Sequence, residues 1–175
     1  MTRAEPSGDD AQPFRVSFVC TGNICRSPMA EVVLRARAER AGLTDQLAVE
    51  SAATGDWHVG EPADQRTIDA LERAGFDGSH HRARQFDPAN FPQFDLVVAF
   101  DRGQARILRN WAPTTAEKEK VRMLLEFSPD ATERVDVPDP YYSDAATFDR
   151  VLEMIERSTS ALFRQLAPAL RQGIR

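Results

Sequence analysis

Cysteine is scarce in this chain, which has 2 Cys among 175 residues, and this scarcity excludes two kinds of structure. Two cysteines do not form a disulfide framework, and a pair spaced Cys-x4-Cys with no nearby histidine lacks the ligands of a zinc site. We therefore expect no metal, a reducing compartment and a cytoplasmic protein. Secretion by a route that needs no signal peptide is left open.

Long hydrophobic runs are also missing from the chain. No apolar stretch approaches the roughly 18 residues that span a membrane. Residues 1–13 are polar and have no hydrophobic centre, unlike a secretory signal. The formal net charge of -5 has the wrong sign for a general nucleic-acid binder, which carries a basic face. We expect a soluble protein with neither a membrane nor a nucleic acid as partner.

The composition is that of one folded unit. Hydrophobic residues make up 42% of the chain and charged residues 28%, which is ordinary for a soluble globule. A chain of this length buries about 70% of the surface of its unfolded state, enough for one core without disulfides. We predict a disordered tail over residues 1–13, a single domain over residues 14–172, and a monomer.

Apolar runs alternate with helical periodicities along the chain. We predict strands at 15–19, 47–52, 94–100 and 121–125, helices at 29–41, 64–74, 102–111 and 146–170, and loops at 112–120 and 126–143. Strands that alternate with helices favour right-handed crossovers, and hence an open parallel sheet with helices on both faces. A ligand would bind at the carboxyl ends of the strands.

The string C-T-G-N-I-C-R-S-P, residues 20–28, joins the first predicted strand to the first predicted helix. Pro28 suits the first turn of a helix, where its missing donor is not needed. Gly22 and Asn23 tolerate left-handed or strained backbone conformations. The loop can therefore curl and turn its amides inward.

Amides that converge at a helix N-terminus form an anion site. Arg26 adds a planar fork of donors that suits a phosphate or another tetrahedral oxyanion. The same positive field favours the thiolate of Cys20, and Ser27 can donate a hydrogen bond to its sulfur. The loop thus predicts a nucleophile that faces a bound phosphate.

The spacing of a Cys, five residues and Arg-Ser resembles the signature of the cysteine-dependent phosphatases. The longer string C-T-G-N-I-C-R-S-P-M-A-E resembles the low-molecular-weight protein tyrosine phosphatases, and G-D-W-H-V-G resembles their actinobacterial members. The resemblance covers residues 16–166 and implies an α/β domain with four parallel strands in the order 2-1-3-4. It also implies phosphotyrosine proteins as substrates, no cofactor, and binding of inorganic phosphate and oxyanion inhibitors.

In this family the Cys loop supplies both the nucleophile and the phosphate site. The resemblance implies that Cys20 forms a phosphocysteine and that Arg26 binds the phosphate oxygens. The other loop residues that it assigns to phosphate binding are Thr21, Gly22, Asn23, Ile24, Cys25 and Ser27.

The string D-V-P-D-P-Y-Y, residues 136–142, carries a second group of candidates. Two prolines stiffen the backbone on either side of Asp139, which alone would indicate only a turn. The resemblance implies that Asp139 is the general acid and base of the reaction. Tyr141 and Tyr142 would form one aromatic wall of a substrate slot, and Trp57 the opposing wall.

Three further residues are expected to support the loop rather than react. The resemblance implies that His81 and Ser51 brace the phosphate loop and that Asp101 lies in the same layer. The other two histidines, His58 and His80, have no such counterpart, and we expect them at the surface.

Other functions on the same fold remain open at this point. An arsenate reductase would share the loop, but its thiol-coupled forms use additional cysteines. A protein arginine phosphatase would have Thr where this chain has Ile24. Outside the enzymes, the chain could be a catalytically dead phosphoprotein-binding module or a redox sensor built on Cys20 and Cys25. The sequence favours the tyrosine phosphatase.

Overall fold

The structure is a computed structural model that describes residues 12–130 and 135–173. Residues 1–11 of the predicted tail lie outside the described residues. The helices and strands are β1 (Phe14–Cys20), α1 (Arg26–Arg40), β2 (Leu47–Ala53), α2 (Gln65–Arg73), β3 (Leu96–Ala99), α3 (Arg102–Trp111), α4 (Thr115–Glu119), β4 (Val121–Met123) and α5 (Ala145–Arg171), with 3₁₀ helices at Pro88–Gln93 and Leu124–Phe127.

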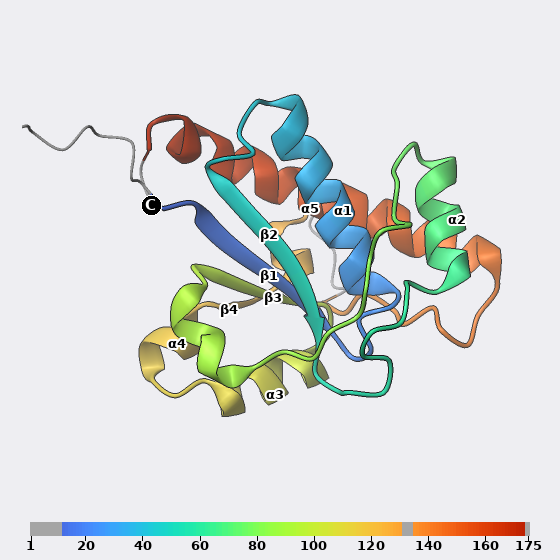
Figure 1. Cartoon of the computed structure of the whole chain (residues 1–175), viewed down its shortest axis with the longest axis horizontal. Coiled ribbons are helices and arrows are strands. Elements are labelled where there is room, and N and C mark those ends of the chain that lie inside the picture. Colours follow the sequence, from blue (N-terminus) through green and yellow to red (C-terminus); the bar gives the residue numbers. More distant parts are fainter. Residues whose placement is uncertain (1–11, 131–134, 174–175) are drawn as a thin grey trace, which may run out of the picture.

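The four strands form one parallel sheet in the order β2-β1-β3-β4. This order confirms the prediction of an open α/β sheet. The alternation of side chains in β1 explains why the sheet needs cover on both faces. Val16 and Phe18 pack with α1 and α5, whereas Val19 packs with α3. The sheet lies between these two layers (Figure 1).

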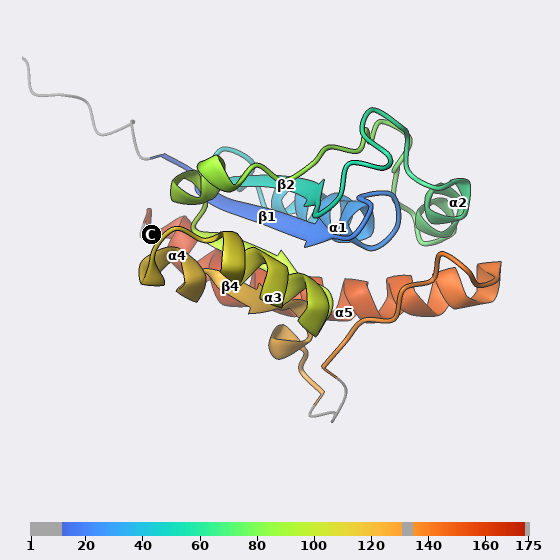
Figure 2. The same cartoon turned by 90° about the horizontal axis from the view of Figure 1, so that it is seen from below.

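The C-terminal helix α5 covers one face of the sheet, as its apolar periodicity indicates. It packs along α1 and also contacts α2. Figure 2 shows α5 extending past the sheet toward α2. Within residues 12–130 and 135–173, no helix combines the length and the apolarity that crossing a membrane requires.

Two predictions near the fourth strand are wrong. The predicted loop at 112–120 contains α4, which is capped where the Thr114 side chain accepts a hydrogen bond from the Glu117 amide. The fourth strand ends at Met123, because the chain enters a 3₁₀ helix at Leu124. Part of the predicted loop at 126–143, residues 131–134, lies outside the described residues.

Candidate active site

The Cys loop, defined here as residues 20–26, lies at the carboxyl edge of the sheet, where β1 ends and α1 begins. Asn23 adopts a left-handed conformation with φ of 57°, as expected for an asparagine in a tight loop. Gly22 has no positive φ, so the left-handed conformation that glycine would tolerate does not occur at this position. A Cβ there would lie 3.0 Å from a ring carbon of His58, so glycine leaves room for that ring.

The Cys20 sulfur is buried, and its polar neighbours are an amide of its own loop and a hydroxyl at the start of α1. The Asn23 amide donates to it over 3.3 Å, and the Ser27 hydroxyl lies 2.9 Å away. The Asn23 side chain donates to the Ser27 oxygen over 2.7 Å, and the Ser27 hydroxyl has two acceptors within reach, the Cys20 sulfur and, at 3.5 Å, the Ala52 carbonyl. The sulfur therefore lies within hydrogen-bond distance of both a backbone amide and a hydroxyl group.

The N-terminus of α1 is arranged for an anion. Among the residues that the structure describes, no side chain caps it at Cys25, and its first turn has no acidic residue. The first amides of a helix lack partners within the helix and carry the positive end of its dipole. Phosphate is the kind of ligand that satisfies both.

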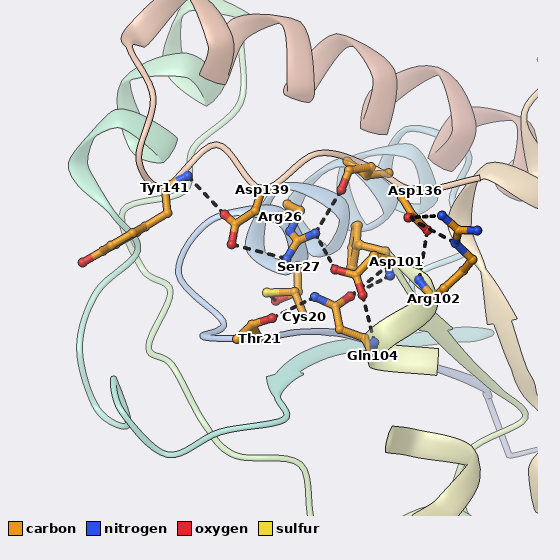
Figure 3. Close-up of polar contacts among 12 residues, drawn as sticks. Cys20, Thr21, Arg26, Ser27, Asp101, Arg102, Gln104, Asp136, Asp139 and Tyr141 are labelled. Atoms are coloured by element: carbon orange, nitrogen blue, oxygen red, sulfur yellow. Dashed lines mark hydrogen bonds and ion pairs between the residues drawn. The ribbon is translucent and has the colours of Figure 1, made fainter. Parts of the chain in front are cut away.

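Arg26 is buried, with 3% of its surface exposed, and acceptors from two other segments of the chain hold its guanidinium in place. One terminal nitrogen donates to the Asp101 carboxylate over 3.0 Å and to the Val137 carbonyl over 2.9 Å (Figure 3). The other lies 3.6 Å from the Asp139 carboxylate. The arrangement fixes the orientation of the guanidinium at the pocket.

Gln104 is a support residue that the sequence reasoning missed. Asp101 and Gln104 form a capping box at the start of α3, and the Gln104 side chain also donates to the Thr21 hydroxyl over 3.1 Å (Figure 3). The spacing Asp-x-x-Gln before an apolar run predicts the capping box. It gives no signal for the contact with Thr21, which lies 83 positions away in the chain.

Asp139 lies beside the Cys loop, as the resemblance implies. Its carboxylate accepts a hydrogen bond from the Tyr141 amide over 3.1 Å and faces Arg26, while the Tyr141 ring extends away from Arg26 (Figure 3). The neighbouring Asp136 instead accepts from the Arg102 amide over 3.0 Å. Of the two carboxylates in this stretch, only Asp139 lines the pocket.

The pocket above the Cys loop has a volume of about 400 Å³. Its lining brings together most of the predicted site residues, together with His58, which was not predicted: Cys20, Thr21, Gly22, Ile24, Cys25, Arg26, Trp57, Asp139, Tyr141 and Tyr142. The rings of Tyr141 and Tyr142 meet edge to face, with centroids 4.9 Å apart. Trp57 and Tyr142 are 67% and 95% exposed, so a bound substrate can cover large aromatic surfaces.

His58 is partly exposed at the surface, as expected, but it also lines the pocket, which was not predicted. Its side chain is 26% exposed, its ring centroid lies 6.2 Å from that of Tyr141, and Nδ1 lies 2.7 Å from the Glu61 carboxylate. Sequence spacing gave no signal for this packing. His80 is exposed, as expected.

A buried polar network supports the Cys loop from behind. The Asn23 side chain donates to the Ser51 hydroxyl over 2.9 Å, and Ser51 in turn donates to the Glu31 carboxylate. His81 donates to the Asn23 carbonyl over 2.7 Å, and its other ring nitrogen lies 3.7 Å from Glu31. His81 and Ser51 therefore lie where the predicted brace needs them. Glu31 was missed.

Glu31 joins the two halves of this network. Burial alone would raise the pKa of its carboxyl group, but the contacts with His81 and Ser51 and the charge of Arg35 hold that pKa below its ordinary value. The charged form of Glu31 is thus part of the folded structure. Its position on α1, directly after P-M-A, places it behind the loop.

Glu31→Gln is expected to lower the free energy of unfolding by about 2 kcal/mol at neutral pH, because it weakens charge-assisted hydrogen bonds in a buried site. The folded-state pKa of Glu31 is depressed. Its contribution is therefore complete above the unfolded-state pKa and is lost as the pH falls through the folded-state value.

Denaturant titrations from pH 7 down to about pH 3 measure this difference, since the unfolded-state pKa of Glu is about 4.3. The exposed Glu39→Gln, on the same helix, is the matched control and should change stability by less than about 0.5 kcal/mol. A Glu31→Gln deficit that grows as the pH falls would contradict the role of the charge.

Cys25 differs from Cys20 in its surroundings. Burial, followed by the negative charge of Asp64, raises the pKa of the Cys25 thiol to about 12. Cys25 therefore stays protonated at neutral pH and does not compete as a nucleophile. The described residues contain no group of three or more His, Cys, Asp or Glu side chains that could hold a metal ion.

Known proteins share both the sequence and the fold. A family model described as low molecular weight phosphotyrosine protein phosphatase matches residues 15–172. The low molecular weight protein-tyrosine-phosphatase of Streptomyces coelicolor is 51% identical over 150 residues, covering 85% of this chain and 91% of that protein. Low molecular weight protein-tyrosine phosphatase A of Mycobacterium bovis is 44% identical over 153 residues, covering 87% and 91%.

A solved crystal structure shows that the similarity extends to the fold. Protein tyrosine phosphatase from Entamoeba histolytica, solved with Hepes in the active site, matches with a TM-score of 0.83 at 30% identity, covering 89% of this chain and 98% of that chain. The resemblance to actinobacterial members is confirmed, and the Streptomyces protein is more similar than the mycobacterial one. The chain therefore belongs to the low molecular weight protein-tyrosine phosphatase family.

Proposed function

We propose that this chain hydrolyses phosphotyrosine in proteins through a phosphocysteine intermediate. The observation that supports this most directly is the Cys20 sulfur, which has two donors at the N-terminus of α1 and lines a pocket together with Arg26 and Asp139. A nucleophile, an anion site and an acid thus meet in one pocket. These are the parts that cleavage of a phosphate ester requires.

In the first step the Cys20 thiolate attacks phosphorus in line with the phenolic oxygen. The sulfur–phosphorus bond forms as the bond from phosphorus to the phenolic oxygen breaks, and Asp139 gives its proton to that oxygen. Arg26 and the first amides of α1 bind the equatorial oxygens.

In the second step water attacks the phosphocysteine and phosphate leaves. Asp139, now a carboxylate, accepts a proton from the water, and the sulfur departs as a thiolate. The Ser27 hydroxyl and the Asn23 amide stabilise that thiolate, because both lie at hydrogen-bond distance from the sulfur. Hydrolysis of an aryl phosphate by the wild type and by Cys20→Ser, with a chelator present, tests the whole proposal.

The choice of phosphotyrosine rests on the shape and lining of the pocket. A phosphotyrosine side chain can reach Cys20 at the pocket floor while its ring lies against Tyr141 and Trp57. Phosphoserine is shorter and has no ring. Phosphoarginine is long enough but has no aryl face, and Ile24 narrows the space for its guanidinium.

We expect kcat/KM for phosphotyrosine peptides to exceed that for matched phosphoserine and phosphoarginine peptides by at least about 10²-fold. Trp57→Ala should narrow this gap by removing aromatic contact worth about 1 kcal/mol. The measurement is kcat/KM for the three peptides with both enzymes, and Trp57→Phe is the control that keeps a ring. Comparable kcat/KM values for phosphoarginine and phosphotyrosine peptides would favour the alternative function of a protein arginine phosphatase.

The remaining alternatives are weaker. The raised pKa of Cys25 opposes a role as a ready redox partner of Cys20, and arsenate reduction of the thiol-coupled kind needs more than the 2 Cys of this chain. Intact Cys20, Arg26 and Asp139 oppose a dead binding module. We further propose a monomeric, cytoplasmic enzyme that binds inorganic phosphate. Hepes in the Entamoeba relative carries a sulfonate, which is also a tetrahedral oxyanion.

A further inference from the structure

We propose that Arg66 is a positioning residue that holds Asp139 at its working distance from Cys20. The inference rests on the proposed function, in which Asp139 is the acid and base. Arg66 is outside the pocket lining, and no motif in the sequence marks it as a functional residue. We call residues 136–143 the acid loop.

Arg66 is first fixed to its own helix. Asp64 is the N-cap of α2, and its carboxylate accepts hydrogen bonds from the Arg66 amide over 2.9 Å, from Nε over 3.0 Å and from Nη2 over 2.8 Å. These hydrogen bonds hold the pKa of the Asp64 carboxyl below its ordinary value. A guanidinium bound in this two-point fashion has little freedom left.

The remaining donors of Arg66 bind the backbone of the acid loop. Nη2 donates to the Tyr141 carbonyl over 2.9 Å, and Nη1 donates to the Ser143 carbonyl over 2.9 Å. The guanidinium also lies over the Phe148 ring, 4.4 Å from its centroid, and that ring is fully buried at the start of α5. The cation thus joins α2, the acid loop and α5.

One residue connects this contact to the acid. The Tyr141 carbonyl accepts from Arg66, and the Tyr141 amide donates to the Asp139 carboxylate over 3.1 Å. The other end of this chain of contacts reaches the Cys loop, because the Asp64 amide donates to the Ile24 carbonyl over 2.9 Å. The first turn of α2 therefore ties the Cys loop to the acid loop.

The acid loop has a second attachment on its other side. The Val137 amide donates to the Phe100 carbonyl over 2.8 Å, beside the end of β3. Asp139 thus lies between an anchor on the sheet and an anchor on Arg66. A misplacement of about 1 Å in a reacting group can cost about 10²-fold in rate, so losing one anchor should be visible in proton transfer.

The test uses two substrates that depend differently on the acid. Phenyl phosphate needs a proton for its leaving oxygen, whereas p-nitrophenyl phosphate has a much better leaving group and needs it less. We expect Arg66→Met to lower kcat/KM for phenyl phosphate about 10-fold more than for p-nitrophenyl phosphate. Arg66→Lys, which keeps the charge but lacks the fork, should fall between Arg66→Met and the wild type.

Arg73→Met is the matched control. Arg73 lies on the same helix and also links α2 to α5, through a 2.7 Å ion pair with Asp149, but it has no contact with the acid loop among the described residues. Arg73→Met should leave the ratio of kcat/KM for phenyl phosphate to kcat/KM for p-nitrophenyl phosphate unchanged. If circular dichroism shows that Arg66→Met does not fold, the test rests on Arg66→Lys. A ratio of kcat/KM for the two substrates equal to that of the wild type would then contradict the inference.

A double-mutant cycle separates positioning from general loosening of the fold. In the Asp139→Asn background there is no acid left to position, so Arg66→Met should change kcat/KM less than about 2-fold. An equal loss on both substrates, or additive effects of Arg66→Met and Asp139→Asn, would overturn the inference and leave the proposed function standing. If Asp139→Asn alone shows no dependence on the leaving group, the assignment of the acid itself fails.

Discussion

Cys20→Ser is expected to lower kcat/KM for aryl phosphates by at least about 10⁴-fold. A serine hydroxyl is not ionised at neutral pH and is a far weaker nucleophile than the thiolate that the proposed mechanism uses. The phosphate site should survive, since Arg26 and the N-terminus of α1 are unchanged. The variant should still bind phosphotyrosine peptides.

The measurement is steady-state hydrolysis of phenyl phosphate with a chelator present, together with calorimetric titration of a phosphotyrosine peptide. Cys25→Ser is the matched control, because it makes the same exchange in the same loop. It should retain at least about a tenth of the activity, because its thiol stays protonated and is not the nucleophile. Equal rates for Cys20→Ser and the wild type would rule out covalent catalysis.

Asp139→Asn should reduce kcat/KM by about 10²-fold or more with phosphotyrosine, whose leaving phenol has a pKa near 10. An amide keeps the shape of the side chain and can still accept from the Tyr141 amide, but it has no acidic proton to give. The loss should shrink for p-nitrophenyl phosphate. The fold should be preserved, because the carboxylate is about half exposed.

Asp136→Asn provides the comparison for this variant. Asp136 lies in the same loop and pairs with Arg102 at the start of α3 instead of lining the pocket. Its removal should not alter how the rate depends on the leaving group. A loss that is the same for phenyl and p-nitrophenyl phosphate in Asp139→Asn would mean that Asp139 positions the substrate and that another group supplies the proton.

The sheet and the Cys loop could be predicted from the sequence because their signals are local. Apolar runs such as residues 94–100 mark buried parallel strands, and the C-T-G-N-I-C-R-S string sits between a strand and a helix. The four strands follow from these signals, with boundaries shifted by a few residues, whereas their order was implied only by the family resemblance. The short helix α4 was missed, although Thr114 followed three residues later by Glu117 is a capping signal.

The support around the site could not be predicted, because it depends on contacts between distant parts of the chain. Arg66 meets the acid loop 75 positions later, and Glu31 meets Ser51 20 positions later. An arginine in the first turn of a helix or a glutamate in a helix is ordinary in sequence. The place of His58 in the pocket could not be predicted for the same reason, since only the folded chain brings its ring to Tyr141.

The N-terminus of α1 has a thermodynamic consequence for the whole protein. Most helices are closed by a side chain of their own, but within the described residues α1 has none at Cys25. A tetrahedral oxyanion bound there would accept hydrogen bonds from the first amides of α1 and so serve as the cap. Substrate binding and capping of α1 would then be the same event. Such an anion at ten times its Kd adds about 1.4 kcal/mol to the apparent stability of the protein. The free energy of unfolding is therefore higher when substrate or phosphate is bound than when the site is free.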